Sequence, residues 1–246
     1  MKRIVISLAL TLSVFCCLYA NENDVAGHLE AAESFYQNEN YEDAIGEYEV
    51  LILDGFINPY VYYNLSDAYY RNNEIGKAVL NLERALKITP RNKIFQHNKE
   101  FFSNLIQEPK KNVAEQFLYK TLLLFSLNEV ILVTIILFIL FLLTCSYYLF
   151  KLNKKVIPYL IAIVTLNIVC FSLLSLKVYD EILLNKYIVV QNVQVRNSPS
   201  KDEDISFEIN EGRQVVVLSE VGRWVNIKLS VDGLTGWIDK NLIEKI

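Results

Sequence analysis

The stretch that decides the fold of the N-terminal half is NLSDAYYRNNEIGKAVLNLERALKITP, Asn64 to Pro90. It has a helix-turn-helix pattern that is rich in small residues and tyrosines. Three of its positions repeat an upstream pattern at an offset of about 34 residues, the period of an array of helical hairpins. The upstream residues are Phe35, Ala44 and Tyr48, and their counterparts are Tyr69, Ala78 and Leu82.

Small residues occupy equivalent places in the two predicted hairpins. Ala32 and Ser66 lie in the first helices, and Ala44 and Ala78 lie in the second helices. Small side chains at helix contacts let two helix axes approach closely. We therefore expect close packing within each hairpin at these four positions.

The array resembles tetratricopeptide repeats, most closely over residues 59–92. Residues at the signature places of this copy are Tyr62, Leu65, Ser66, Tyr69, Ala78, Leu82, Ala85 and Pro90. The first copy, residues 25–58, keeps four of these places but has His28 and Phe56 where the family has a bulky residue and a proline. The resemblance implies an all-α repeat array over residues 21–108.

A capping helix is expected after the second repeat, because a repeat array needs a closing element at its end. Residues 93–106 place four apolar side chains at helical spacing, namely Ile94, Phe101, Leu105 and Ile106. Asn58 followed by Pro59 is typical of a helix start, and Pro90 predicts a helix end.

Residues 1–20 have the pattern of a signal peptide: two basic residues, an apolar stretch from Ile4 to Leu18, and Ala20 before polar sequence. Cleavage after Ala20 is one interpretation. Lipid attachment at Cys16 or Cys17 and retention of the segment as an anchor are the alternatives.

Two further apolar segments, residues 130–150 and 156–176, are each long enough for the about 20 helical residues that cross a bilayer. The loop between them, residues 151–155, carries three lysines and is predicted to be cytoplasmic by the positive-inside rule. Residues 109–129 and 177–186 are predicted linkers. With this loop in the cytoplasm of a bacterium, the domains before and after the two spans both lie on the periplasmic side of the inner membrane.

Polar residues in the predicted spans have two interpretations, a transport path or ordinary structural contacts. We favour a helix-contact hydrogen bond for Asn167, and we expect Glu129 to reach water at the outer boundary.

From residue 187 to 246 the period changes from helical to alternating, which predicts short strands. The alternating apolar residues are Ile205, Phe207 and Ile209, then Val225, Ile227 and Leu229. Glu211-Gly212 and Asp232-Gly233 are predicted turns. A segment of this size buries a core by curling into a small barrel.

This segment resembles the bacterial SH3 domain family in three motifs: VQVRNSPS at residues 193–200, GRWVNIKL, and GLTGWI at residues 233–238. Gln194 replaces the asparagine that is usual before the Val-Arg pair. The candidate surface residues are Arg196, Trp224 and Trp237. They are either ligand contacts or framework residues, and we favour the framework interpretation.

The chemistry of catalysis is missing from the sequence. Cys145 and Cys170 fall in the predicted spans, and His28 and His97 have no neighbouring residues in a metal or nucleophile spacing. There is no glycine-rich phosphate loop, and the net charge of −4 does not favour nucleic acid. We therefore predict no enzyme activity, cofactor, metal or nucleic-acid partner.

In the repeat family the first helix of each pair lines a protein-binding groove. Carried onto this sequence, the groove residues are Leu29, Glu33, Tyr36, Tyr60, Tyr63, Asp67, Tyr70 and Arg71. Tyrosines suit such a surface because they offer a large apolar area and a polar tip. The lack of basic residues at the matching places argues against a carboxylate clamp. The alternative to protein binding is that this face packs against another part of the same chain.

The order of the parts resembles the BatE proteins of the Bacteroides aerotolerance operon family. The resemblance implies a multidomain membrane protein with a tetratricopeptide array, two transmembrane helices and an SH3-like barrel. It also implies partners with von Willebrand factor A domains beside a MoxR-type ATPase. The leading hypothesis is a non-catalytic adapter in envelope or stress function, and the alternative is an envelope anchor that binds peptidoglycan.

Overall fold

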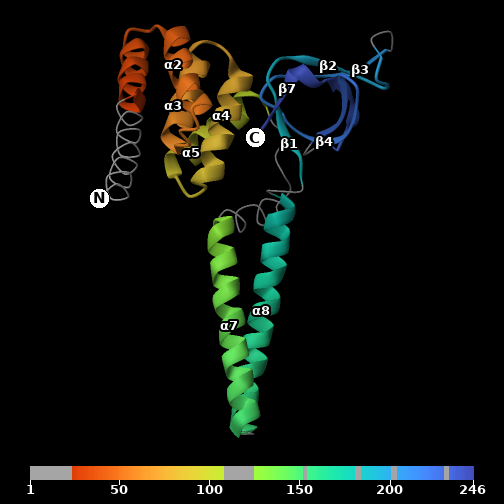
Figure 1. Cartoon of the computed structure of the whole chain (residues 1–246). Helices are drawn as coiled ribbons and strands as arrows, with labels where there is room; N and C mark the ends of the chain where they lie inside the picture. The colour runs from red at the N-terminus through yellow and green to blue at the C-terminus, as the bar shows by residue number, and fades with distance from the viewer. Residues whose placement is uncertain (1–23, 108–124, 152–153, 181–183, 201–203, 230–232) are drawn as a thin grey trace, which may run out of the picture.

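The computed structural model describes residues 24–107, 125–151, 154–180, 184–200, 204–229 and 233–246. The predicted signal peptide, residues 1–20, lies outside these residues. The chain forms an α-helical array, two long apolar helices and a small antiparallel β-domain, as Figure 1 shows. The fold class predicted from the sequence is confirmed.

The array consists of successive helices joined by short connections, so that neighbours run antiparallel. Its helices are residues 24–37, α2 (Tyr41–Leu53), α3 (Pro59–Arg71), α4 (Ile75–Ile88) and α5 (Lys93–Leu105). Asn58 caps α3 by accepting a hydrogen bond from the Tyr60 amide at 2.8 Å, and Pro59 occupies the first helical turn. Asn92 caps α5 in the same way, through the Ile94 amide at 2.9 Å.

The small residues of the array lie where its helices approach one another. Ala32, Ala44 and Ala78 are fully buried. The buried hydroxyl of Ser66 in α3 donates a hydrogen bond to the carbonyl of Ala78 in α4 at 2.6 Å. A side chain this short can reach the backbone of a neighbouring helix only at close approach, so the packing expected at these positions is confirmed.

The buried face of α5 differs from the predicted one. Phe95 and Phe102 are buried, whereas Ile94, Phe101 and Leu105 are exposed. The sequence of α5 holds two apolar stripes offset by one residue, and periodicity alone ranks them equally. Packing against the tyrosines of α3 decides in favour of Phe95 and Phe102, because two buried rings gain more than the one ring and the aliphatic side chains of the other stripe would.

The two long helices are α7 (Leu127–Lys151) and α8 (Ile157–Val178), preceded by the short helix η1 (Lys154–Val156). Both are long and apolar enough to cross a membrane. The amide of Asn167 in α8 donates hydrogen bonds to the carbonyl of Leu137 in α7 at 3.3 Å and to Ile163 within its own helix at 2.9 Å. The predicted helix contact of Asn167 is confirmed.

The C-terminal domain is a curled antiparallel sheet with strand order β3-β2-β6-β5-β4-β1-β7. Its elements are β1 (Lys186–Val189), β2 (Val193–Arg196), β3 (Ile205–Ile209), β4 (Gln214–Val221), β5 (Trp224–Leu229), β6 (Thr235–Asp239), η3 (Lys240–Leu242) and β7 (Ile243–Lys245). Along β5 the residues Val225, Ile227 and Leu229 are buried, and they alternate with more accessible ones. This is the predicted alternation of a barrel strand.

The β-domain is joined to the array through β1. Successive strand residues point to opposite faces. Val189 therefore enters the core of the β-domain, while its neighbour Ile188 enters the core of the array together with Val190. The backbone amide of Gly76 at the start of α4 also donates to the carboxylate of Glu211 at 2.9 Å. The sequence did not predict this contact between the two domains.

Candidate binding surfaces

The predicted binding face of the helical array begins where the first helix meets α3. The hydroxyl of Tyr36 donates a hydrogen bond to the Asp67 carboxylate, and Arg71 lies against the same hydroxyl. Burial, followed by the bond to Asp67, raises the pKa of Tyr36 to about 12. Tyr36 is therefore a protonated donor at neutral pH, and the three side chains hold two repeats together at the centre of the predicted face.

The other tyrosines of this face contact α5. The ring of Tyr63 stacks on Phe95 with centroids 4.8 Å apart, and its hydroxyl accepts a hydrogen bond from Asn98 at 2.8 Å. The ring of Tyr70 meets Phe102 edge to face at 5.5 Å. These tyrosines therefore form the floor between α3 and α5, and they stabilise the array whether or not a partner binds.

The accessible part of the predicted face is smaller than the predicted set. Glu33, Tyr60 and Arg71 are exposed, and Leu29 is half-buried against the array core. The helix α5 adds the exposed ring of Phe101, which sequence reasoning missed because α5 was treated only as a cap. As a binding site, the groove stays a prediction.

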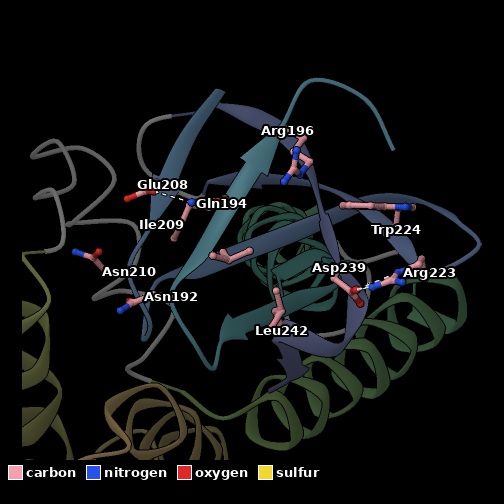
Figure 2. A pocket seen from close by; sticks show the side chains of 11 residues that line it. Asn192, Gln194, Arg196, Glu208, Ile209, Asn210, Arg223, Trp224, Asp239 and Leu242 are labelled. Atoms are coloured by element: carbon pink, nitrogen blue, oxygen red, sulfur yellow. Dashed lines mark hydrogen bonds and ion pairs between the residues drawn. The ribbon is translucent and has the colours of Figure 1, made fainter. Parts of the chain in front are cut away.

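The β-domain has an open groove with a volume of about 690 Å³ (Figure 2). Its lining comes from the β2-β3 hairpin on one side and from the ends of β5, β6 and η3 on the other. The lining residues are Asn192, Val193, Gln194, Arg196, Glu208, Ile209, Asn210, Arg223, Trp224, Asp239 and Leu242. Most of these side chains are polar, so the groove suits a ligand that makes several hydrogen bonds.

Charges of both signs lie along the groove. Gln194 donates to the Glu208 carboxylate at 3.1 Å on one wall. On the other wall, Arg223 pairs with Asp239 through an Nε–Oδ2 hydrogen bond of 3.1 Å, and its guanidinium lies 5.8 Å from the centre of the Trp224 ring. Carboxylates, a guanidinium and an aromatic ring together can hold a peptide that itself carries both charges.

Two of the three predicted residues of this domain line the groove. Arg196 and Trp224 do so, whereas Trp237 is absent from the lining and pairs in register with Arg196 and Asn226 within the sheet. The remaining polar residues of the lining were not predicted as site residues. They come from strand ends that are far apart in the sequence, and among them Gln194 and Arg223 stand within the motifs VQVRNSPS and GRWVNIKL.

In the described part of the chain, no group of three or more His, Cys, Asp or Glu side chains is arranged to hold a metal ion. His28 does have acidic neighbours: its Nδ1 lies 2.5 Å from the Glu47 carboxylate, and its Nε2 lies 3.5 Å from Asp24. The hydrogen bond to Glu47, with smaller charge effects from Glu47, Asp24 and Asp54, raises the pKa of His28 above 6.5.

This ion pair predicts a pH-dependent contribution to stability. A raised folded-state pKa means that the contribution of His28 is fully present below about pH 6.5 and is lost as the pH rises through the folded pKa. We expect His28→Gln to lower the thermal midpoint of the array at pH 5.5 and to leave it nearly unchanged at pH 8.5. Circular dichroism melts at both pH values measure this, and an equal loss at both would contradict it.

The two domains indicate the class of protein. The helical array and the β-domain are both architectures that bind other molecules, so the chain belongs to the class of modular binding proteins. The tetratricopeptide repeat family matches residues 59–92, and the bacterial SH3 domain family matches residues 191–244. No curated protein matches the chain.

Proposed function

We propose that the chain is a membrane-anchored adapter that holds two recognition surfaces on one side of a bilayer. The observation that carries this proposal is the placement of the two domains. Both lie at the same end of α7 and α8, as Figure 1 shows, and these two helices are long and apolar enough to cross a membrane.

The charge at the opposite end supports an orientation. Lys151 ends α7, and Lys154 and Lys155 lie in η1 between α7 and α8, at the end away from the two domains. Basic loops are retained in the cytoplasm. The helical array and the β-domain then face the periplasm of a bacterial inner membrane.

The helical face is the proposed protein-binding surface of the adapter. It offers the exposed groups of Glu33, Tyr60 and Arg71 beside a floor of packed tyrosines. Mixed charges with accessible aromatic area suit an extended or helical protein segment. The resemblance to BatE proteins supports membrane partners with von Willebrand factor A domains, in envelope or stress function.

The groove of the β-domain favours a second candidate function, attachment to the cell wall. Peptides of the wall carry amino and carboxyl groups, and the groove presents Glu208 on one wall and Arg223 and Asp239 beside the ring of Trp224 on the other. In this role the β-domain binds peptidoglycan and the array positions it. The two functions use different surfaces, so one experiment can separate them.

The test is photo-crosslinking in living cells with a benzophenone amino acid at Glu33, at Gln194 and at Glu42. Glu33 and Gln194 are exposed on the two surfaces, and Glu42 is an exposed control in the first turn of α2. We avoid Tyr63 because its contacts with α5 stabilise the array.

Protein adducts at Glu33 that are absent at Glu42 are the expected result for the adapter, and mass spectrometry identifies the partner. Wall-fragment adducts at Gln194 alone would replace the adapter with the envelope anchor. Identical adduct patterns at Glu33 and Glu42 would refute the helical face as a binding site.

A further inference from the structure

One end of the helical array exposes large apolar side chains that no element covers in the described part of the chain. Leu53, Ile57, Tyr60 and Ile94 are 84%, 72%, 60% and 60% exposed. They are the most exposed large apolar residues among residues 24–107. Large apolar side chains seldom cluster on a surface that faces water. An exposed cluster of them marks a contact with a partner protein or a membrane.

The helix directions explain why these residues share one end. Leu53 ends α2, Tyr60 lies in the first turn of α3, and Ile94 lies in the first turn of α5. Since neighbouring helices are antiparallel, residues 54–58 and 89–92 connect helices at the same end of the array. We call Leu53, Ile57, Tyr60 and Ile94 the apolar end.

The opposite end of the array has a different composition. Its connections are residues 38–40 and 72–74, with the sequences NEN and NNE. Every side chain there is polar or acidic. The contrast between the two ends shows that the exposed apolar residues are not a general property of the turns in this array.

An ion pair places the apolar end next to α7. Arg91, in the connection between α4 and α5, pairs with the carboxylate of Glu129 in the first turn of α7. The same carboxylate accepts a hydrogen bond from the Ser126 amide at 2.8 Å. This connection points toward the start of α7 in Figure 1, so the apolar end lies on the side where α7 begins.

We propose that the apolar end is a membrane-contact surface, which rests in the headgroup region of the same bilayer that α7 enters. The inference depends on the proposed crossing of the membrane by α7. The charges at this end are balanced, because Lys87 and Lys93 stand against Asp24 and Asp54 and Arg91 pairs with Glu129. The apolar side chains therefore carry the inference, and Tyr60 is of a residue type that is enriched at membrane interfaces.

This contact deepens the proposed function because it orients the array. When the helices stand on the bilayer by their ends, the helical face formed by the first helix, α3 and α5 opens sideways, parallel to the membrane, and Tyr60 in the first turn of α3 lies at the edge that it shares with the apolar end. A partner held in the same membrane could then reach this face with a segment just above the lipid. Contact also lowers the rotational freedom of the anchored domain, which reduces the entropic cost of binding.

The experiment uses the full chain in liposomes that contain anionic lipid, with all four cysteines replaced. A single cysteine carrying an environment-sensitive NBD dye is placed at Ile57, at Gln37 or at Leu140, one position for each sample. Gln37 is exposed at the polar end of the array, and Leu140 lies within α7. Lipids with a nitroxide either near the headgroup or deep in the acyl chain quench the dye according to its depth.

We expect the dye at Ile57 to be quenched several-fold more strongly by the shallow nitroxide than the dye at Gln37. Interfacial side chains reach about 5–10 Å into the boundary between headgroups and acyl chains, so the deep nitroxide should act weakly at Ile57. The dye at Leu140 should be quenched best by the deep nitroxide. Adding Leu53→Glu should then reduce the shallow quenching at Ile57.

The outcomes separate this inference from the proposed function. Without quenching at Leu140, α7 does not cross the bilayer, and both proposals fail. Deep quenching at Leu140 with equal, weak quenching at Ile57 and Gln37 would overturn the membrane contact alone. A blue-shifted dye at Ile57 that lipid nitroxides do not quench would also overturn it, because a protein surface then covers the apolar end.

Discussion

Replacing Gly236 with valine is expected to destabilise the β-domain strongly. A Cβ atom at this position in β6 would lie 2.3 Å from Cγ1 of Val195 and 3.0 Å from the carbonyl oxygen of Arg196. Val195 is fully buried in β2 and cannot move away without opening the core. Overpacking of this kind costs about 1–3 kcal/mol, a large part of the stability of a domain with about 60 residues.

The measurement is tryptophan fluorescence during urea unfolding. The chain has two tryptophans, Trp224 and Trp237, and both lie in this domain, so their emission reports its unfolding without a signal from the array. Thr235→Val is the matched control, because Thr235 is exposed on the same strand. An unchanged midpoint for Gly236→Val, or equal losses for both variants, would show that β2 and β6 do not approach this closely.

Replacing Gly76 with alanine is expected to separate the β-domain from the array without weakening the helices. A Cβ atom on Gly76 would lie 2.6 Å from the carbonyl oxygen and 2.7 Å from the carbonyl carbon of Val190. These are backbone atoms, so no side-chain rotation relieves the clash. Alanine is otherwise the better helix residue by about 0.5–1 kcal/mol, which leaves α4 intact.

Hydrogen exchange followed by mass spectrometry measures this separation. We expect faster exchange in the peptides that cover β1 and the start of α4, because the hydrogen bond from Gly76 to Glu211 is lost with the docking. Gly46→Ala is the control. Gly46 lies in α2 with open space around it, so its replacement should stabilise that helix by about 0.5–1 kcal/mol. Unchanged exchange in Gly76→Ala would contradict the docked arrangement.

Docking of the two domains changes how an adapter of this kind would act. Two sites on a flexible tether act together through an effective concentration that the tether sets. Here Arg84 of α4 donates to the carbonyl of Lys245 at 2.9 Å, and Ile188 of β1 lies in the array core. The separation of the helical face from the β-domain groove is then set by packing, so a partner or partner pair must match that geometry.

The sequence alone was sufficient for features that depend on local order. Asn58 before Pro59 predicts a helix start because the cap and the proline act within one turn. The alternation of Val225, Ile227 and Leu229 predicts a half-buried strand because side-chain direction reverses at each residue. The two apolar segments predict long helices in the same way, from length and composition.

Tertiary structure decided the features that depend on residues far apart in the chain. The two apolar stripes of α5 are equivalent in periodicity. Which of them is buried is therefore decided by contacts such as that of Phe95 with Tyr63. The groove of the β-domain joins the ends of separate strands. Arg91 meets Glu129, and Gly76 meets Glu211 across 135 residues. Periodicity predicts which side chains share one face of a helix or strand. Which distant part of the chain that face contacts is decided by packing, because such contacts depend on the arrangement of all the elements.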